Sequence, residues 1–453
     1  MKLSFAAKQH YGVFGLGKSG LATVRALLAG GAEVSAWDDN PAHIAALQQA
    51  LPHCQLMPAD MWPWTKLAAL VLSPGVPLTH PKPHPVVMLA KAQQIPIIGD
   101  LELLYRAMPK ARYIAVTGTN GKSTTTSLIG HCLASVESSL EVGGNLGRPV
   151  LDFAPANAYV LEASSYQLEL LATTRFNIAL LLNFSPDHLD RHGDMAGYIA
   201  AKRNIFDRQQ KTDVAILGVD DPASAALCRE LIAAAQQRVI PISGNAPVKG
   251  GVFVQNAILH NRLGEVELTA SLADIKSLQG AHNWQNAAAA YAAVFTYGMT
   301  HEAIIAAMRQ FPGLAHRMQW LGERQGVQYV NDSKATNADA AEKALLTYDN
   351  IYWIIGGVQK EGGITPLARY FPKIRHAYLI GEAALAFADT LGSAVAHSHC
   401  GTLEQAFAAA RNDAERDGVK GAVVLLSPAC ASFDQFRNFE ERGDEFITLF
   451  RGM

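Results

Sequence analysis

The chain has 453 residues, enough for about three domains of ~150 residues each. Hydrophobic residues make up 49% and charged residues 17%, as is typical of a soluble globular protein. Because the formal net charge is only −2, the composition gives no reason to expect nucleic acid or an anionic membrane as a partner.

The cysteines and the N-terminus indicate a cellular compartment. The five cysteines are scattered, odd in number and free of any C-x-x-C pair, which predicts a reducing compartment with neither a disulfide framework nor a zinc site. The N-terminus has no signal-peptide pattern, and no uncharged apolar run reaches about 18 residues. We therefore expect a cytoplasmic protein.

The first predicted element is a strand, Tyr11–Phe14, followed by the glycine-rich turn Gly15–Gly20 and a helix over Leu21–Ala29. A second strand, Glu33–Trp37, ends in Asp38. This G-x-G-x-x-G pattern predicts a diphosphate at a helix N-terminus and a carboxylate near a ribose or a base. The pattern alone leaves NAD and other nucleoside diphosphates open as ligands.

A further strand, Leu67–Leu72, runs into the small-residue turn Ser73-Pro74-Gly75. The proline-rich run Pro77–Pro85 is expected to be a loop or a linker, because proline breaks both sheet ladders and helices. We place a domain boundary near Asp100, so residues 1–100 form a small parallel α/β unit.

The central motif is YIAVTGTNGKSTTT. Tyr113–Val116 is a predicted buried strand, Thr117–Gly121 a small-residue turn, and a helix follows from Lys122. Such a turn forms a phosphate cradle, in which Lys122 reaches the β- and γ-phosphates and the Ser123 hydroxyl binds Mg²⁺. The spacing is G-x-x-G-K-S rather than the common G-x-x-x-x-G-K-[ST].

Polar residues also follow the next strands of this region. Glu162 ends the strand that begins at Ala158, where a carboxylate beside a phosphate loop can bind Mg²⁺. His188 lies just past the strand Ile178–Leu182, and ligands gather at the carboxyl ends of parallel strands, so we interpret it as functional. Lys202 lies on a predicted amphipathic helix, where the pattern does not separate a solvated lysine from a functional one.

The segment GAHNWQN precedes an alanine-rich helix over Ala287–Phe295. Asn283 and Asn286 are three residues apart and share a helix face. The pattern fits recognition of a purine edge and ordinary helix capping equally well.

The last third repeats the alternation of strands and helices. Strands are predicted at Val327–Val330, Ile351–Ile355 and Val423–Leu426, each followed by polar or glycine-rich residues. Before them, His316 and Arg317 form a cationic pair after a proline-glycine hinge. The pattern indicates a third doubly wound unit.

Nine motifs then identify a family. In chain order they are TGTNGKST, GGNLG, LEASSYQLE, SPDHLDRH, AAKRNIF, GAHNWQNAAAA, LAHR, NDSKATN and SPACASFDQFRNFEERG. Together they resemble the Mur ligases of peptidoglycan synthesis over nearly the whole chain, and the last motif is most similar to that of the member that adds glutamate. The short spacing of the phosphate loop is the form that this family uses.

The resemblance implies an α/β fold of three domains. Residues 1–100 would be a Rossmann-like domain that binds the UDP substrate, and residues 101–312 a central P-loop-type ATPase domain with a mostly parallel sheet. Residues 313–453 would be a Rossmann-like domain that binds the amino acid. The implied reaction is ATP-dependent addition of D-glutamate to UDP-N-acetylmuramoyl-L-alanine through an acyl phosphate, serving cell-wall biogenesis, cell shape and cell division. We expect a monomer that acts on small molecules, with neither nucleic acid nor membrane as a partner.

The resemblance also implies site residues. ATP would contact Gly118, Thr119, Asn120, Gly121, Lys122, Ser123, Thr124, Asn286, His316, Arg317 and Asp332. The UDP substrate would contact Lys18, Ser19, Asp38, Gly75, Asn145 and His188. The amino acid would contact Lys334, Thr336, Lys360, Ser432 and Phe439. Two Mg²⁺ sites would use Ser123, Glu162, His188 and a carbamylated Lys202, and the catalytic group would be Lys122, Glu162, His188 and Lys202.

One departure and four alternatives remain at this point. Val358-Gln359 stands before Lys360, where the family often has Asp-Gly or Lys-Pro. A Mur ligase for another amino acid and folylpolyglutamate synthase share the phosphate cradle, but the latter lacks a leading UDP domain. An NAD-dependent oxidoreductase explains GLGKSG and leaves GTNGKST without a role. A non-catalytic nucleotide switch would not need the polar clusters of all three domains.

Overall fold

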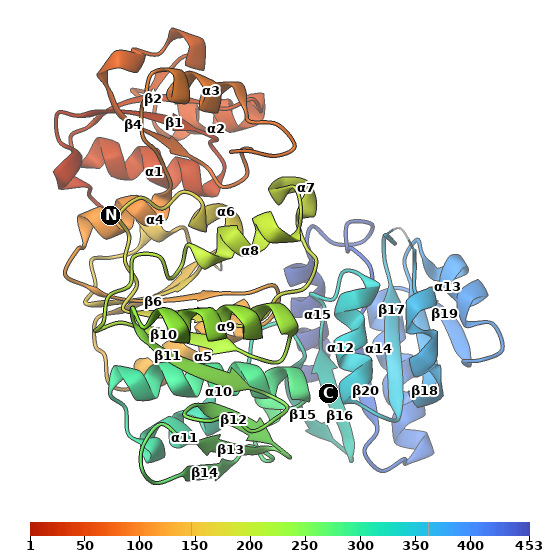
Figure 1. Cartoon of the computed structure of the whole chain (residues 1–453). Helices are drawn as coiled ribbons and strands as arrows, with labels where there is room; N and C mark the ends of the chain where they lie inside the picture. The colour runs from red at the N-terminus through yellow and green to blue at the C-terminus, as the bar shows by residue number, and fades with distance from the viewer. Residues whose placement is uncertain (146, 361) are drawn as a thin grey trace. The chain divides into compact units, whose positions relative to one another are not determined.

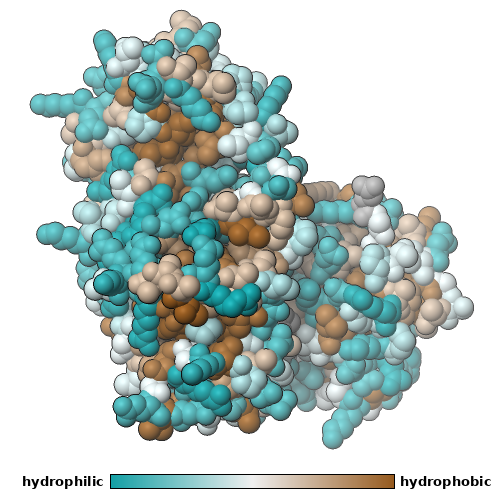
Figure 2. Space-filling model, viewed as in Figure 1, coloured by the Kyte–Doolittle hydropathy of each residue, from teal (hydrophilic) through white to brown (hydrophobic). Residues whose placement is uncertain are grey.

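The computed structural model describes residues 1–145, 147–360 and 362–453. These residues divide into two compact units. Unit 1 holds residues 1–272 and 281–309, and unit 2 holds residues 273–280 and 310–453. Figure 2 shows polar residues over much of the viewed face of the chain, with apolar side chains in scattered patches. In the part of the chain that is described, no helix is long and apolar enough to cross a membrane.

The N-terminal part of unit 1 is a parallel sheet with strand order β3-β2-β1-β4-β5. Its strands are β1 (His10–Phe14), β2 (Glu33–Trp37), β3 (Gln55–Leu56), β4 (Leu67–Leu72) and β5 (Ile97–Ile98). Its helices are α1 (Lys18–Ala29), α2 (Pro41–Ala50) and α3 (Pro85–Ala92), and α4 (Asp100–Ala107) leads into the next sheet. The predicted Rossmann-like order of strand, glycine turn and helix is confirmed. Helix α1 begins at Lys18, earlier than expected, so Lys18 and Ser19 lie in its first turn.

The rest of unit 1 is built on a larger sheet with strand order β14-β13-β12-β11-β10-β9-β6-β8-β7 (Figure 1). Its strands are β6 (Arg112–Thr117), β7 (Leu140–Gly144), β8 (Ala158–Glu162), β9 (Ile178–Leu181), β10 (Val214–Gly218), β11 (Arg238–Ser243), β12 (Val252–Gln255), β13 (Ile258–Asn261) and β14 (Leu268–Ser271). Its helices are α5 (Lys122–Leu133), α6 (Ser165–Leu168), α7 (Leu189–His192), α8 (Met195–Arg203), α9 (Pro222–Ala234), α10 (Ala281–Tyr297) and α11 (His301–Gln310). Strands β7 to β12 pair in parallel, and β13 and β14 add an antiparallel edge that the sequence patterns did not predict.

Both faces of the central sheet are covered. Alternate residues of β6, such as Ala115, belong to a core that also holds residues of α1, α4 and α9. Residues that point to the other face of the sheet, such as Ile114 and Leu180, are equally buried. Helix α10 packs against α5 and against β10 to β12. Strands buried on both faces have near-continuous apolar sequences, which is why the pattern predicted β6, β8 and β9, although the buried β10 was not predicted.

Unit 2 contains a sheet with strand order β15-β16-β20-β17-β18-β19. Its strands are β15 (Gln319–Arg324), β16 (Val327–Asn331), β17 (Ile351–Gly356), β18 (Ile374–Ile380), β19 (His397–Gly401) and β20 (Val423–Leu426). Its helices are α12 (Ala338–Thr347), α13 (Ala384–Leu391), α14 (Leu403–Asp417) and α15 (Phe439–Arg451). All pairings are parallel except that of β15 with β16. The third predicted α/β unit is therefore present.

Short 3-10 helices connect these elements. They span Ser4–Ala6, Ala59–Met61, Trp64–Lys66, Val150–Asp152, Lys276–Leu278 and Thr365–Lys373. The proline-rich segment contains no strand, and its last residue, Pro85, starts α3. The predicted domain boundaries at residues 100 and 312 stay predictions.

Candidate active site

The phosphate loop lies between β6 and α5, as predicted. Gly118 and Gly121 both have positive φ, +148° and +83°, and Gly121 is the residue before the first turn of α5. A Cβ at Gly121 would lie 2.2 Å from Asn286 Oδ1, so only glycine fits beside α10 here. Ser123 and Thr124 follow in the first turn of α5. The loop thus places a helix N-terminus, which favours anions, at the carboxyl end of the sheet.

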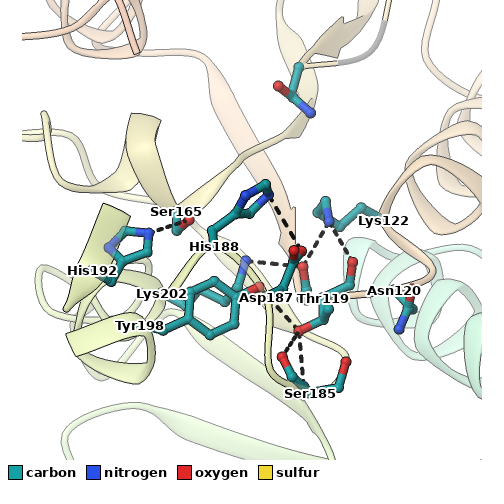
Figure 3. Close-up of polar contacts among 12 residues, drawn as sticks. Thr119, Asn120, Lys122, Ser165, Ser185, Asp187, His188, His192, Tyr198 and Lys202 are labelled. Atoms are coloured by element: carbon teal, nitrogen blue, oxygen red, sulfur yellow. Dashed lines mark hydrogen bonds and ion pairs between the residues drawn. The ribbon is translucent and has the colours of Figure 1, made fainter. Parts of the chain in front are cut away.

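Two lysines meet at one carbonyl of this loop (Figure 3). Lys122 Nζ donates to Gly118 O and Thr119 O, each at 2.8 Å, and Lys202 Nζ donates to Gly118 O at 3.0 Å. Lys202 is 2% exposed and is therefore not the solvated residue that its helix pattern allowed. Burial, reinforced by the charge of Lys122, lowers the pKa of Lys202 to about 7.

Glu162 supplies the carboxylate at the end of β8. It is 3% exposed and lies opposite Val116 of β6, so it is next to the start of the phosphate loop. Asn145 Nδ2 donates to Glu162 Oε1 at 2.8 Å, which brings the predicted substrate residue Asn145 into the same site. Within the described residues, Glu162 Oε2 is buried without a hydrogen-bond partner. A buried carboxylate oxygen of this kind needs a cation or a donor. Leu146, the next residue of GGNLG, lies outside the described residues.

His188 lies in the loop after β9 with φ +52° and precedes the short helix α7. Its Nε2 is 3.4 Å from Asp187 Oδ2, and both side chains are about half exposed. Its ring packs beside that of Tyr166, with centroids 5.1 Å apart. His188 thus presents an accessible imidazole at the same sheet edge as Glu162.

A relay of side chains holds the loop residue Asn120, and sequence reasoning did not single out its members. Asn183 Oδ1 accepts from the Asn120 backbone N–H at 2.9 Å, and Asn183 Nδ2 donates to Gln285 Oε1 at 3.0 Å. Gln285 Nε2 in turn donates to Asp220 Oδ2 at 2.8 Å. The hydroxyls of Thr119 and Tyr198 lie 3.1 Å apart. Asn183 and Asp220 are polar residues that follow strands, and this was the one sign in the sequence that they could be functional. Their partners could not be predicted, because Asn183 and Gln285 are 102 residues apart in sequence.

Asn286 faces the phosphate loop from α10. Its Oδ1 accepts from Thr125 Oγ1 at 3.3 Å, and its Nδ2 donates to Asn283 Oδ1 at 3.2 Å. The two amides therefore do share a helix face. Helix α10 begins at Ala281, so these residues lie in its first turns rather than before it.

The predicted UDP residues gather at the carboxyl ends of β1, β2 and β4. Asp38 accepts from the backbone N–H groups of Leu16 and Asn40, and its Oδ2 lies 3.0 Å from His43 Nδ1. Burial alone would raise the pKa of Asp38, but these hydrogen bonds lower it overall. Asp38 therefore braces the glycine-rich turn as a carboxylate.

Ser19, Lys18 and Gly75 complete this group. The Ser19 hydroxyl donates to the fully buried Asp100, whose pKa is raised by burial. Lys18 begins α1, and Gly75 lies in the turn after β4. A Cβ at Gly75 would meet no atom within 4 Å, so its backbone is open to close approach.

In unit 2, His316, Arg317 and Asp332 lie around the end of β16. Asp332 is 4% exposed and accepts from the Ser427 hydroxyl at 2.8 Å and from Met318 N–H at 3.0 Å. Burial raises the pKa of Asp332 to about 7. His316 has φ +60°, and its Nδ1 lies 3.1 Å from Asn331 Nδ2. The structure therefore brings together the nucleotide residues predicted for this unit.

The predicted amino-acid residues lie beside them. Lys334 Nζ lies 5.2 Å from the ring centre of Phe439, and the Lys334 backbone N–H donates to His316 O at 2.9 Å. Thr336 N–H donates to Lys334 O at 2.8 Å. Ser432 is buried in the loop after β20. Val358 bridges to Ala431, which places the segment leading to the exposed Lys360 beside that loop.

No role was predicted for Arg442 from the sequence. It is 1% exposed, and its guanidinium donates to Ser333 Oγ at 3.0 Å and to the carbonyls of Ser333 and Cys430 at 2.8 and 3.1 Å. It thereby ties the loop after β16 to the loop after β20. An arginine one helical turn into a charged helix gives no sign of burial in the sequence.

A glycine-lysine-serine loop at the edge of a parallel sheet, beside a buried carboxylate and a buried lysine, defines a nucleotide-binding α/β enzyme. Comparison with known proteins gives the family. Residues 9–99 match the Mur ligase MurD-like N-terminal domain, residues 116–294 the Mur ligase middle domain, and residues 316–430 the Mur ligase glutamate ligase domain. The chain belongs to the Mur ligase family.

Curated relatives agree with this assignment, and solved structures share the fold. The chain is 49% identical over 450 residues to the UDP-N-acetylmuramoylalanine–D-glutamate ligase of Rhodospirillum rubrum, covering 98% of this chain and 94% of that protein. It is 52% identical to the ligase of the same name from Rhizobium etli, covering 96% and 93%. The fold is similar to that of UDP-N-acetylmuramate-alanine ligase MurC from Thermotoga maritima, with a TM-score of 0.57, 18% identity and coverage of 98% and 99%. MurF from Thermotoga maritima in complex with ADP has a TM-score of 0.56, with 16% identity and coverage of 99% and 96%.

Proposed function

We propose that this chain joins the carboxyl group of UDP-N-acetylmuramoyl-L-alanine to the amine of D-glutamate, using ATP. The observation that carries the proposal is that Lys122, Lys202 and Glu162 lie together at the phosphate loop. This arrangement combines two cations suited to phosphate with a carboxylate whose Oε2 has no hydrogen-bond partner among the described residues. The similarity to curated D-glutamate ligases over nearly the full chain supports the choice of substrates.

Residues of unit 1 would hold the triphosphate. The loop backbone and the N-terminus of α5 would face the polyanion, and Lys122 would supply a positive charge. Lys122 now donates to two loop carbonyls, so it would exchange these contacts for phosphate oxygens. The further ATP contacts that we propose are Gly118, Thr119, Asn120, Gly121, Ser123, Thr124 and Asn286, with His316, Arg317 and Asp332 from unit 2.

Magnesium fits the donor set around Glu162. The unpartnered Glu162 Oε2 is a hard oxygen ligand, and Ser123 and His188 come from neighbouring strand ends. Among the described residues, no three His, Cys, Asp or Glu side chains cluster into a metal site. The proposed set therefore includes a hydroxyl and a modified Lys202, with two ions in all. Bound Mg²⁺ would offset the negative charge of the transferring phosphoryl group.

The carbamylation of Lys202 has a physical rationale. Only a neutral amine reacts with CO₂, and the buried Lys202 shares the Gly118 carbonyl with a second lysine, which disfavours its charge. A carbamate would replace a second cation by a carboxylate-like oxygen pair. We expect Lys202→Ala to lose activity and to regain part of it with added short carboxylates. A variant that retains full activity would contradict this role for Lys202.

The two substrates would occupy the outer domains. Lys18, Ser19, Asp38 and Gly75 would contact the uridine diphosphate end, and Asn145 and His188 the end that carries the reacting carboxylate. D-Glutamate would contact Lys334, Thr336, Lys360, Ser432 and Phe439. A cytoplasmic monomer without nucleic-acid or membrane partners remains part of the proposal.

The substrate carboxylate must be activated, because its direct reaction with an amine would have to expel hydroxide, which is a poor leaving group. The substrate carboxylate attacks the γ-phosphoryl group of ATP, giving an acyl phosphate and ADP. Lys122 stabilises the charge on the transferring group. The glutamate amine then attacks the acyl carbon, and phosphate leaves after a general base takes a proton from the amine. We assign this base to no residue, since a metal-bound His188 could not accept the proton.

The test is phosphate release with a panel of amino acids. Purified protein should release phosphate from ATP only when UDP-N-acetylmuramoyl-L-alanine, D-glutamate and Mg²⁺ are all present. The same assay with L-glutamate, D-alanine and L-lysine tests the choice of amino acid, and folate tests the folate-ligase alternative. Release with another acceptor, or none with the full set, would refute the proposal.

A further inference from the structure

The guanidinium of Arg191 binds a turn that lies far away in the sequence. Its Nη1 donates to Gly75 O at 2.8 Å, and its Nη2 to Pro74 O at 3.3 Å and to Val76 O at 3.2 Å. Three consecutive carbonyls thus converge on one planar cation. Because a guanidinium has a rigid fork of donors, this contact fixes the orientation of the turn as well as its position.

This turn carries the open backbone of Gly75. Ser73 anchors it to the glycine-rich loop, since its hydroxyl donates to Gly15 O at 2.7 Å and its N–H to Phe14 O at 2.9 Å. Its carbonyls at positions 74–76 are used by Arg191. On the side of Gly75 where a Cβ would lie, no atom is within 4 Å, and this residue belongs to the region that the proposed function gives to the uridine diphosphate.

The other end of Arg191 belongs to the helix that follows His188. The helix α7 has only four residues, so its own hydrogen bonds do little to fix it. Side chains fix it instead: the Arg191 guanidinium stacks 4.6 Å from the ring centre of Tyr166, and His192 Nε2 lies 2.9 Å from Ser165 Oγ. Tyr166 also packs against His188, at 5.1 Å between ring centres. Figure 3 shows His188 and His192 near Ser165 at the edge of the site.

We propose that Arg191 is a positioning residue that couples the uridine diphosphate turn to His188. It holds both segments at once, so a diphosphate that orders the turn also orders α7 and the imidazole before it. Binding energy from the uridine diphosphate end of the substrate thereby helps to position His188 at the end that carries the reacting carboxylate. This inference rests on the proposed function and adds a role that does not require Arg191 to touch the reacting atoms.

The kinetic test compares Arg191→Met with Arg191→Lys. Methionine keeps the apolar stem, and lysine keeps a charge that cannot fork across three carbonyls. We expect kcat/KM for UDP-N-acetylmuramoyl-L-alanine to fall at least about tenfold in Arg191→Met, with a fall in kcat, because charged hydrogen bonds are lost. Lysine should restore part of the loss. The KM for ATP should change less than about twofold, since the phosphate loop has its own supports.

Arg25→Met is the matched control. Arg25 Nη1 lies 3.3 Å from Asp152 Oδ1, so it also joins the first sheet's helix α1 to the segment after β7, but on the surface and with more than half of its side chain exposed. Its kinetic constants should match those of the unchanged protein. An equal loss in both variants would show a general effect of weakening unit 1 and would overturn the coupling role.

A binding experiment separates coupling from simple damage. Hydrogen exchange is measured with saturating uridine 5′-diphosphate alone, on peptides covering residues 73–76 and 187–194. We expect both segments to be protected in the unchanged protein and only residues 73–76 in Arg191→Met. Protection of residues 187–194 in the variant as well, or their lack of protection in the unchanged protein while residues 73–76 are protected, would overturn the inference.

The two proposals fail in different ways. If the unchanged protein makes no product from the full substrate set and binds no uridine diphosphate, the proposed function fails and the coupling role falls with it. If the unchanged protein is active and Arg191→Met has normal kinetic constants, only the coupling role is refuted.

Discussion

The buried Glu102 provides a quantitative test of how unit 1 is held together. It lies in α4 with a fully buried side chain and accepts five hydrogen bonds from residues 172–174. The donors are Thr173 and Thr174, each through N–H and hydroxyl at 2.6 to 3.0 Å, and the N–H of Ala172 at 3.0 Å. Arg106 Nε adds a bond at 2.8 Å. The carboxylate therefore fastens α4 to the loop after α6.

The expected magnitude follows from the pKa of Glu102. Burial alone would raise this pKa, but the threonine hydroxyls and backbone N–H groups lower it from 4.5 to about 2. A fall of roughly 2.5 units corresponds to about 3 kcal/mol of folding free energy at neutral pH. Since the folded pKa is depressed, this stabilisation is present above about pH 4.5 and is lost as the pH falls toward 2.

The test substitution is Glu102→Gln, which removes the charge and turns one oxygen into a donor that faces other donors. We expect a loss of about 3 kcal/mol in urea unfolding at pH 7, and a loss of roughly half that or less at pH 3. At pH 3 the glutamate is protonated in the unfolded chain but still mostly ionised in the folded one, so only part of the stabilisation is left. Amide exchange at pH 7 should place the loss in residues 100–107 and 170–176.

Glu265→Gln is the control, because Glu265 lies in an exposed turn between β13 and β14. Its effect should stay within about 0.5 kcal/mol at every pH. A Glu102→Gln difference below about 1 kcal/mol at pH 7, or one of equal size at pH 3 and pH 7, would refute the reasoning.

Three further predictions concern the nucleotide residues. Lys122→Ala should lower kcat at least about 10²-fold in the phosphate-release assay, because its charge acts on the transferring group, and near-normal turnover would contradict that role. Gly121→Ala should weaken ATP binding at least about tenfold, since its φ is +83° and the new Cβ would lie 2.2 Å from Asn286 Oδ1, whereas Gly264→Ala, which meets no atom within 4 Å, should bind ATP normally. Burial raises the pKa of Asp332 to about 7, so this carboxyl group stays protonated in the folded protein while it ionises in the unfolded chain. The folded state therefore loses stability as the pH rises from about 4 to 7. Asp332→Asn should gain in Tm relative to the unchanged protein over that range, and a Tm difference that does not vary with pH would contradict this.

The sequence predicted several central strands and their ends, among them β6, β8 and β9, for a physical reason, whereas β10, β11 and β18 were not predicted. Parallel strands buried on both faces are continuous apolar runs, and the polar residue that follows such a run must lie at the carboxyl edge of the sheet. Glu162 and His188 were found in this way and Lys122 through the phosphate-loop motif, and the structure places all three at one edge. The burial of Lys202 could not be predicted, because it depends on which face of α8 packs against the loop.

Contacts between distant segments were the other missing part. Nothing local distinguishes Gln285 from any polar residue of a helix, yet it links Asn183 to Asp220. Arg191 likewise reads as a charge in a polar loop until its partners at positions 74–76 are known. The antiparallel edge of β13 and β14 was missed because its strands are short and partly exposed, and so lack a continuous apolar run.

The amide relay fixes the conformation of the glycine-containing phosphate loop in the folded protein. Gly118 and Gly121 have positive φ in the folded protein. Glycine has many conformations in the unfolded chain, so ordering the phosphate loop has a large entropic cost. Asn183 fixes the Asn120 backbone, and Gln285 fixes Asn183 while being held by Asp220. Asp220 in turn accepts a hydrogen bond from the Gly244 N–H at 2.8 Å. Each amide thus uses its donor and its acceptor on different segments, and the cost of ordering the loop is met during folding rather than during ATP binding.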